Sequence, residues 1–139
     1  MKVKSAMHKP VKCVELDTPV REVAKRMRTA DIGAIPVQHN GVLVGMITDR
    51  DIACRAVANG SDLDTLHARD IMSKELATCS ADDDLMIAVA RMKKKHVRRL
   101  PVVDHSKAVV GMLSLGDISH KLATEVSGQV LRSVSAHHS

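Results

Sequence analysis

Hydrophobic and polar residues follow one another along this chain in a pattern that predicts short strands and amphipathic helices in a fixed order. The elements predicted in the first half are a strand over Val11–Leu16, a helix after Thr18-Pro19, a hairpin of Ala34–Val37 and Val42–Ile47 around Asn40-Gly41, and a helix over Asp49–Ala58. The proline at position 36 favours an edge position for its strand. The predicted order is therefore strand, helix, strand, strand, helix.

The second half predicts the same order of elements. They are a strand over Leu76–Cys79, a helix that begins near Asp82–Asp84, a hairpin of Arg99–Val103 and Val109–Leu113, and a helix that begins near Leu115. Residues 126–134 can extend the last helix, and we expect residues 135–139 to fray. The apolar residues that recur at helical spacing in the two long helices are Val20, Val23, Ala24 and Met27 in the first half and Leu85, Ala88, Val89 and Met92 in the second, and we expect them to face inward.

The two halves are copies of one unit. Met7 and Met72, Asp17 and Asp82, Met27 and Met92, and Pro36 and Pro101 all lie 65 positions apart, and the offset becomes 66 for Gly45 and Gly111 and for Asp51 and Asp117. A period of this size predicts a duplicated structural unit. We therefore expect an α+β fold of two tandem repeats, over residues 1–66 and 67–127, with a C-terminal tail or helix extension over residues 128–139.

The most informative repeated stretch links a strand to a helix. Its two copies are Gly45–Ile52 and Gly111–Ile118. In each copy a hydroxyl residue, Thr48 or Ser114, follows an apolar strand, and an acid, Asp51 or Asp117, comes three positions later. The free N–H groups of such a junction can bind a phosphate, and the carboxylate can accept hydrogen bonds from ribose hydroxyls. The same residues are also ordinary helix caps, which need no ligand.

Pairing of the two repeats would place both copies of this stretch on one cleft. A three-stranded sheet with helices on one face leaves its other face uncovered in a unit this small. Two such units can cover one another, and a twofold relation between them would bring the two hydroxyl and acid pairs to opposite sides of a shared cleft.

Composition excludes several classes of function. The 139 residues are 45% hydrophobic and 27% charged, which is ordinary for a soluble globular protein. The chain has no Phe, Tyr or Trp on which bases could stack, so we expect no base-reading nucleic-acid partner despite the formal net charge of +5. The start of the chain lacks the apolar region of a signal peptide, and its apolar runs are too short to span a membrane. We therefore expect a cytoplasmic protein with no membrane partner.

Neither a metal site nor a catalytic site is indicated. The three cysteines, Cys13, Cys54 and Cys79, include no C-x-x-C pair, and we expect reduced thiols that are mostly buried. The eight histidines are scattered without the spacing of a metal-binding pair. No Ser/His/Asp or Cys/His arrangement has a recognisable context, so we expect a protein that is not an enzyme.

The repeated motifs resemble a known family. The stretches Met72-Ser73-Lys74 and Leu100–Asp104, and the pattern Gly-x-x-Thr/Ser-x-x-Asp in both copies, resemble the cystathionine β-synthase (CBS) domain, a tandem pair of which is called a Bateman module. The resemblance extends over about residues 5–125. It implies βαββα units related by pseudo-twofold symmetry, and an adenine nucleotide such as AMP, ADP, ATP or NAD in the cleft between the repeats, with no required cofactor. It also implies a non-catalytic module that signals energy or redox state to an unidentified partner protein.

The resemblance further implies roles for individual residues. Asp51 and Asp117 would hold the ribose hydroxyls, Thr48, Ser114 and Arg98 the phosphate, and Ile32 and Val97 the adenine ring. In the first copy Asp49 places a second carboxylate near the phosphate, and Arg50 could neutralise it. Because Arg98 corresponds to Gly33, we expect the site built on Ser114 to bind anions better.

Two other functions remain open at this stage. The chain could be a protein-interaction module whose cleft is vestigial. It could also be a nucleic-acid-associated protein that uses the basic run over residues 91–99, although such a run is also typical of the solvated end of a helix. Whichever function holds, we expect a homodimer of the tandem pairs, because a second copy would cover the apolar faces of the two long helices.

Overall fold

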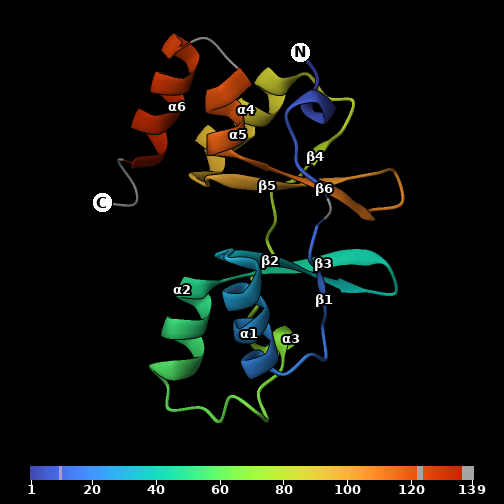
Figure 1. The fold of residues 1–139 in the computed structure, drawn as a ribbon, viewed down its shortest axis with the longest axis vertical. Helices are drawn as coiled ribbons and strands as arrows, with labels where there is room; N and C mark the ends of the chain where they lie inside the picture. The colour runs from blue at the N-terminus through green and yellow to red at the C-terminus, as the bar shows by residue number, and fades with distance from the viewer. Residues whose placement is uncertain (10, 122–123, 136–139) are drawn as a thin grey trace. The chain divides into compact units, whose positions relative to one another are not determined.

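The computed structural model describes residues 1–9, 11–121 and 124–135, and the side chains of residues 124–129 lie outside this description. The chain forms two compact units, each with a three-stranded sheet (Figure 1). One unit, Lys12–Leu76, is called here the Thr48 unit. The other consists of Met1–Val11 together with Ala77–Ser139 and is called the Ser114 unit.

The Thr48 unit contains every element predicted for the first half of the chain. Its elements are β1 (Val14–Glu15), α1 (Val20–Ala30), β2 (Ala34–His39), β3 (Val42–Thr48), α2 (Asp49–Asp51), a π-helix η2 (Ile52–Val57) and α3 (Ala68–Ile71). The sheet has the order β1-β2-β3, with β1 parallel and β3 antiparallel to β2. The helices lie on one side of this sheet (Figure 1).

The Ser114 unit repeats this arrangement. Its elements are a short 3-10 helix η1 (Val3–Ser5), β4 (Cys79–Ser80), α4 (Leu85–Lys95), β5 (Arg99–Val103), β6 (Val109–Ser114), α5 (Leu115–Lys121) and α6 (Thr124–Ser135). The sheet order is β4-β5-β6, with the same parallel and antiparallel pairs. The predicted α+β fold class and its duplication are therefore confirmed. Part of the tail expected to fray, residues 136–139, lies outside the described residues.

The two long helices end in the same way, which positions the loops that follow them. Asp31 after α1 and His96 after α4 both have left-handed backbone angles, with φ of 55°. The next amides, of Ile32 and Val97, donate to the carbonyl five residues earlier at 3.0 and 3.1 Å. Such a C-terminal cap stops the helix and turns the chain sharply. The chain then enters β2 or β5 almost at once.

Each unit has its own hydrophobic core. Ala24 of α1 is only partly buried against the core of the Thr48 unit, and the other residues predicted to face inward from α1 and α4 are buried, which confirms that part of the helix assignment: Val20, Val23, Met27, Leu85, Ala88, Val89 and Met92. Because these side chains pack inside their own unit, a second copy is not needed to cover them. That reason for expecting a homodimer is wrong.

The predicted edge position of Pro36 is also wrong, because β2 is the middle strand. The strand tolerates proline since β1 is only two residues long and pairs with β2 from Val37 onward. Met46 lies opposite Pro36 in β3 and forms its backbone hydrogen bonds with Ser73 instead. The N–H of Met46 donates to the carbonyl of Ser73 at 3.1 Å, and the N–H of Ser73 donates to the carbonyl of Met46 at 2.9 Å. The missing N–H of the proline therefore costs no ladder hydrogen bond. Pro101 occupies the same position in β5.

In each repeat, the segment that precedes the first strand lies against the sheet formed by the other repeat. His8 pairs with Met112 on the edge of β6, and Ser73 pairs with Met46 on the edge of β3. Val3, in the same N-terminal segment, is fully buried in the core of the Ser114 unit. Residues 1–11 thus belong structurally with the second half of the chain, and residues 68–76 with the first half.

Two glycines make room for these bordering segments. A Cβ at Gly45 would lie 2.5 Å from the Sδ of Met72, and a Cβ at Gly111 would lie 2.6 Å from the Sδ of Met7. A Cβ at Gly45 would also lie 3.0 Å from the Cβ of Met72. Moving only the tip of the methionine would therefore relieve less of the clash at Gly45 than at Gly111.

Replacing Gly45 by alanine is expected to lower the free energy of unfolding by about 1–3 kcal/mol, because the added methyl group overpacks this contact. Urea denaturation followed by circular dichroism measures the change. The double variant Gly45→Ala/Met72→Ala should lose less than the sum of the two single variants, since the clashing sulfur is gone. Additive losses would show that Met72 is not what excludes a side chain at position 45.

Candidate functional site

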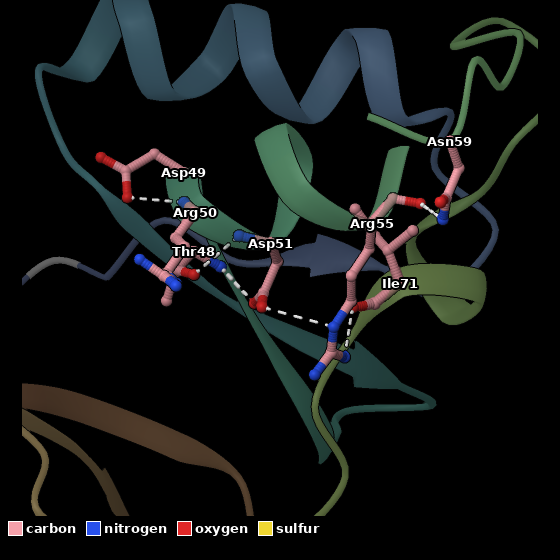
Figure 2. Close-up of polar contacts among 7 residues, drawn as sticks. All are labelled: Thr48, Asp49, Arg50, Asp51, Arg55, Asn59 and Ile71. Carbon is pink, nitrogen blue, oxygen red and sulfur yellow. Dashed lines mark hydrogen bonds and ion pairs between the residues drawn. The ribbon is translucent and has the colours of Figure 1, made fainter. Parts of the chain in front are cut away.

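The strand-to-helix junction of the Thr48 unit is held by two reciprocal hydrogen bonds. The backbone N–H of Asp51 donates to Oγ1 of Thr48 at 3.1 Å, and the N–H of Thr48 donates to Oδ2 of Asp51 at 2.8 Å (Figure 2). This is a capping box, which satisfies two N–H groups that the start of a helix leaves unpaired. We call residues 48–51 the Thr48 corner.

A cation that the sequence did not reveal lies beside Asp51. Arg55, in the π-helix, places its Nε 3.8 Å from Oδ1 of Asp51, and its Nη1 donates to the carbonyl of Ile71 at 3.1 Å (Figure 2). The carbonyl of Arg55 in turn accepts from the side chain of Asn59 at 3.0 Å. Arg55 therefore partly neutralises Asp51 and ties the corner to the end of α3.

The other two residues of the Thr48 corner contribute charge at its surface. Asp49 and Arg50 are both exposed, and Oδ1 of Asp49 accepts from the backbone N–H of Arg50 at 2.9 Å. Among the described residues, the guanidinium of Arg50 forms no ion pair with Asp49. That Arg50 neutralises Asp49 therefore stays a prediction.

The Ser114 unit has the same junction with a different neighbour. The N–H of Asp117 donates to Oγ of Ser114 at 3.1 Å, and the N–H of Ser114 donates to Oδ2 of Asp117 at 2.9 Å. Residues 114–117 are called here the Ser114 corner. The same Oδ2 lies 3.0 Å from Nδ1 of His8, which comes from the N-terminal segment. The sequence pattern did not point to His8, because the two residues are 109 positions apart.

The structure brings Arg98 to the Ser114 corner. Its carbonyl accepts from the N–H of Leu115 at 2.7 Å, and the following residue, Arg99, pairs with Ser114 across β5 and β6. The side chain of Arg98 is exposed and makes no ion pair within the described residues. In the Thr48 unit the matching bond runs from Asp49 to the carbonyl of Gly33, at 2.9 Å. Position 98 therefore lies beside the Ser114 corner, as position 33 lies beside the Thr48 corner, and a role of the Arg98 side chain in anion binding stays a prediction.

The two residues predicted to contact adenine lie next to these loops. Ile32 precedes Gly33 and Val97 precedes Arg98, and each is partly buried against the core of its own unit. Their place beside the corners follows from the helix ends described above. Contact with adenine stays a prediction, as does the shared cleft, because each unit is described by itself.

Of the three cysteines, Cys79 has the burial expected of a structural residue. Cys79 is 1% exposed, and the pKa of its thiol is raised to about 11, mainly by burial and secondly by the charge of Asp83, while Arg91 opposes the rise. The pKa of Cys13 is also raised, mainly by burial and secondly by Glu15. Cys54 is exposed, so the prediction of buried thiols does not hold for it.

Thiol labelling at pH 8 is expected to separate Cys54 from Cys79. With a pKa of about 11, only about one Cys79 thiol in a thousand is ionised at that pH, and the thiolate is the reactive form. Ellman's reagent should therefore modify Cys54 first and Cys79 only when the protein unfolds in urea. Equal labelling rates of the two cysteines in the folded protein would contradict the burial of Cys79, and Cys54→Ser identifies the fast phase.

Comparison with known proteins decides the family. The profile of the CBS domain matches residues 3–56 and again residues 68–124. The chain belongs to the CBS domain family. The two matches correspond to the duplication found in the sequence and to the two corners, and CBS domain proteins are in general regulatory rather than catalytic.

Individual CBS proteins are similar over almost the whole chain. The CBS domain-containing protein YhcV of Bacillus subtilis is 38% identical over 134 residues, which are 96% of this chain and 94% of YhcV. Hypoxic response protein 1 of Mycobacterium tuberculosis is 30% identical over 92% of this chain and 90% of its own length. The crystal structure of hypoxic response protein I with two coordinated zinc ions has a TM-score of 0.80 and covers 88% of this chain and 100% of that one.

One solved structure contains adenosine compounds. The CBS domain pair of protein MJ0100, in complex with 5′-methylthioadenosine and S-adenosyl-L-methionine, is 30% identical with a TM-score of 0.77. The alignment covers 86% of this chain and 94% of that one.

Metal-binding clusters and membrane-spanning helices are both absent from the described part of the chain. It contains no group of three or more His, Cys, Asp or Glu residues that could hold a metal ion. Among the same residues, no helix combines the length and the apolar character that crossing a membrane requires.

Proposed function

We propose that this chain binds an adenosine-containing ligand at its Thr48 and Ser114 corners and works as a non-catalytic regulatory module. The observation that carries the proposal is the repeated corner, in which a capping box holds a carboxylate beside a loop. Membership of the CBS family supports it, as does a similar domain pair that binds 5′-methylthioadenosine and S-adenosyl-L-methionine.

The geometry of the corners suits a ribose. Asp51 and Asp117 are partly buried and held by backbone hydrogen bonds, so they need little reorganisation on binding. A carboxylate has two oxygens with about four lone-pair sites, and only some of them are used inside the protein. The remaining sites can accept the two neighbouring hydroxyls of a ribose, the role an acid has in dinucleotide sites.

The charge beside each corner suggests which ligands bind. Arg98 lies beside the Ser114 corner, and its guanidinium, a group well suited to phosphate, makes no ion pair with the residues that the structure describes. We propose AMP, ATP or NAD as the ligand there, and a signalling role in which the ligand changes the affinity of the chain for a partner protein. Such signalling requires that the ligand bind two states of the module with different affinities.

A docking module without a ligand is the second candidate. It is favoured by the observation that both acids are already engaged, by the capping boxes and by Arg55 or His8. In that case the repeated Thr/Ser-x-x-Asp pattern serves only to cap the helices.

Thermal unfolding followed by circular dichroism distinguishes the two candidates. The protein is melted alone and with millimolar AMP, ATP, NAD, S-adenosylmethionine or 5′-methylthioadenosine. A ligand at 100 times its dissociation constant adds about 2.7 kcal/mol to the free energy of unfolding, so a bound ligand raises the midpoint by several degrees. An unchanged midpoint with all five compounds favours the docking module.

A homodimer remains part of the proposal, on a different surface from the one first expected. Met86 and Ile87 on α4 are 47% and 44% exposed, although both are large apolar side chains. Val57, at the end of the π-helix, is exposed as well. Apolar surface of this kind is often covered by a second subunit.

A further inference from the structure

His8 reaches the Ser114 corner because its backbone is fixed to the edge of β6. Its N–H donates to the carbonyl of Met112 at 2.9 Å, and the N–H of Met112 donates back to the carbonyl of His8 at 3.1 Å. Ser73 makes the same pair of bonds with Met46 on the edge of β3, at 2.9 and 3.1 Å. Residues 8 and 73 are also 65 positions apart, so they are equivalent in sequence and in structure.

The side chains at these equivalent positions differ in their contacts with the acid of the neighbouring corner. Nδ1 of His8 lies 3.0 Å from Oδ2 of Asp117, whose side chain is 24% exposed. Within the described residues, the hydroxyl of Ser73 makes no hydrogen bond. The β6 strand itself carries no titratable side chain, and the acid that faces His8 comes from α5. The bordering segment therefore places an imidazole on the acid of one corner only.

The contact leaves Asp117 unable to receive a ribose with both oxygens. Oδ2 already accepts from the N–H of Ser114 and is shared with His8, which together use its two lone-pair directions. Only Oδ1 is left with free lone-pair sites, so two adjacent ribose hydroxyls cannot each take a different oxygen of this carboxylate. A ribose that places one hydroxyl on each oxygen of Asp117 must displace the imidazole.

We propose that His8 is an internal competitor for the ribose at the Ser114 corner and that residue 8 or 73 sets the ligand affinity of its corner. This inference rests on the proposed function. Ligand binding at Asp117 detaches the His8 side chain, and occupancy of the corner is thereby linked to the N-terminal segment. At the Thr48 corner Ser73 makes no hydrogen bond with the acid within the described structure, and the neighbour of Asp51 is Arg55, whose Nε lies 3.8 Å from Oδ1 and leaves Oδ2 to the capping box.

Reciprocal substitutions test this proposal. His8→Ser copies the Thr48 unit, and it is made in a chain that also carries Asp51→Ala, so that calorimetry with AMP or 5′-methylthioadenosine reports on the Ser114 corner. Because contacts between exposed side chains contribute little, we expect affinity to rise about two- to fivefold relative to Asp51→Ala alone. Ser73→His, in a chain with Asp117→Ala, should weaken binding at the Thr48 corner by a similar factor. Circular dichroism confirms that each variant is folded.

Each outcome bears on the proposal. Tighter binding after His8→Ser supports competition, and weaker binding after Ser73→His adds independent support. Unchanged or weaker binding after His8→Ser shows that His8 only anchors the segment or assists the ligand, which overturns the inference and leaves the proposed function standing. If neither compound binds the original chain or the variants, the proposed function fails, and the inference fails with it.

Discussion

Replacing Asp117 by alanine is expected to weaken the binding of AMP about tenfold to a hundredfold, the effect of losing hydrogen bonds to a charged acceptor. Replacing Asp51 should weaken it less, because the Ser114 corner has Arg98 for the phosphate, whereas the Thr48 corner has Gly33 at the matching position and the carboxylate of Asp49 nearby. Titration calorimetry on the two single variants measures both losses.

The loss at Asp117 must be separated from the loss of the helix cap. Alanine also removes the acceptor for the N–H of Ser114, which lowers the stability of the protein by about 1 kcal/mol. Asp117→Asn is the matched control, because its side-chain oxygen can still accept that hydrogen bond while the negative charge is gone. Equal losses for Asp117→Ala and Asp51→Ala, or no loss in either, would contradict the assigned roles.

Replacing Arg98 by alanine is expected to weaken the binding of AMP about threefold to thirtyfold, since a guanidinium hydrogen-bonded to phosphate is one of the stronger contacts at a surface. Binding of 5′-methylthioadenosine should change little, because this ligand has no phosphate. The selectivity between the two ligands, measured by calorimetry, therefore falls in the variant.

The control for Arg98 is another exposed cation. Lys94, in the last turn of α4, is exposed and carries the same charge, but none of its hydrogen bonds or ion pairs links it to the corner. Lys94→Ala should leave the selectivity for AMP unchanged. An equal loss in both variants would mean that the general positive charge of the chain, rather than Arg98, attracts the nucleotide.

The duplicated fold could be predicted from the sequence because its signals are local. Hairpins follow from strand patterns on either side of turn residues, and the long helices follow from buried positions spaced by three and four residues. The repeated Thr/Ser-x-x-Asp pattern also placed both corners at the right junctions. Bringing Arg98 to Ser114 required only the hairpin register of β5 and β6.

The remaining features depend on contacts between distant parts of the chain. His8 and Asp117 are far apart in sequence, and the N-terminal segment was assigned to the first repeat although it packs with the second. The sequence hinted at this exchange of segments only through the equivalence of Met7 and Met72. Their packing against Gly111 and Gly45 follows from the fold and not from a local pattern. The predicted helix over residues 49–58 forms, but most of it is a π-helix, a geometry that propensities do not distinguish.

The edge assignment of Pro36 shows how a sound rule can fail locally. Proline is excluded from central strands because it cannot donate to a neighbouring strand. Here the neighbouring strand β1 ends before it would need that donor, and β1 itself was predicted to be longer than its two residues. The length of a short parallel strand is set by tertiary pairing, which a periodic pattern does not show.

Calorimetric titration of the original chain and of the double variant Asp51→Ala/Asp117→Ala tests the central claim most directly. With AMP or 5′-methylthioadenosine as the ligand, the account predicts saturable binding to the original chain and a loss of at least tenfold in a double variant that is still folded by circular dichroism. Equal affinity in the two proteins, or no binding of AMP, ATP, NAD, S-adenosylmethionine or 5′-methylthioadenosine to the original chain, would contradict it.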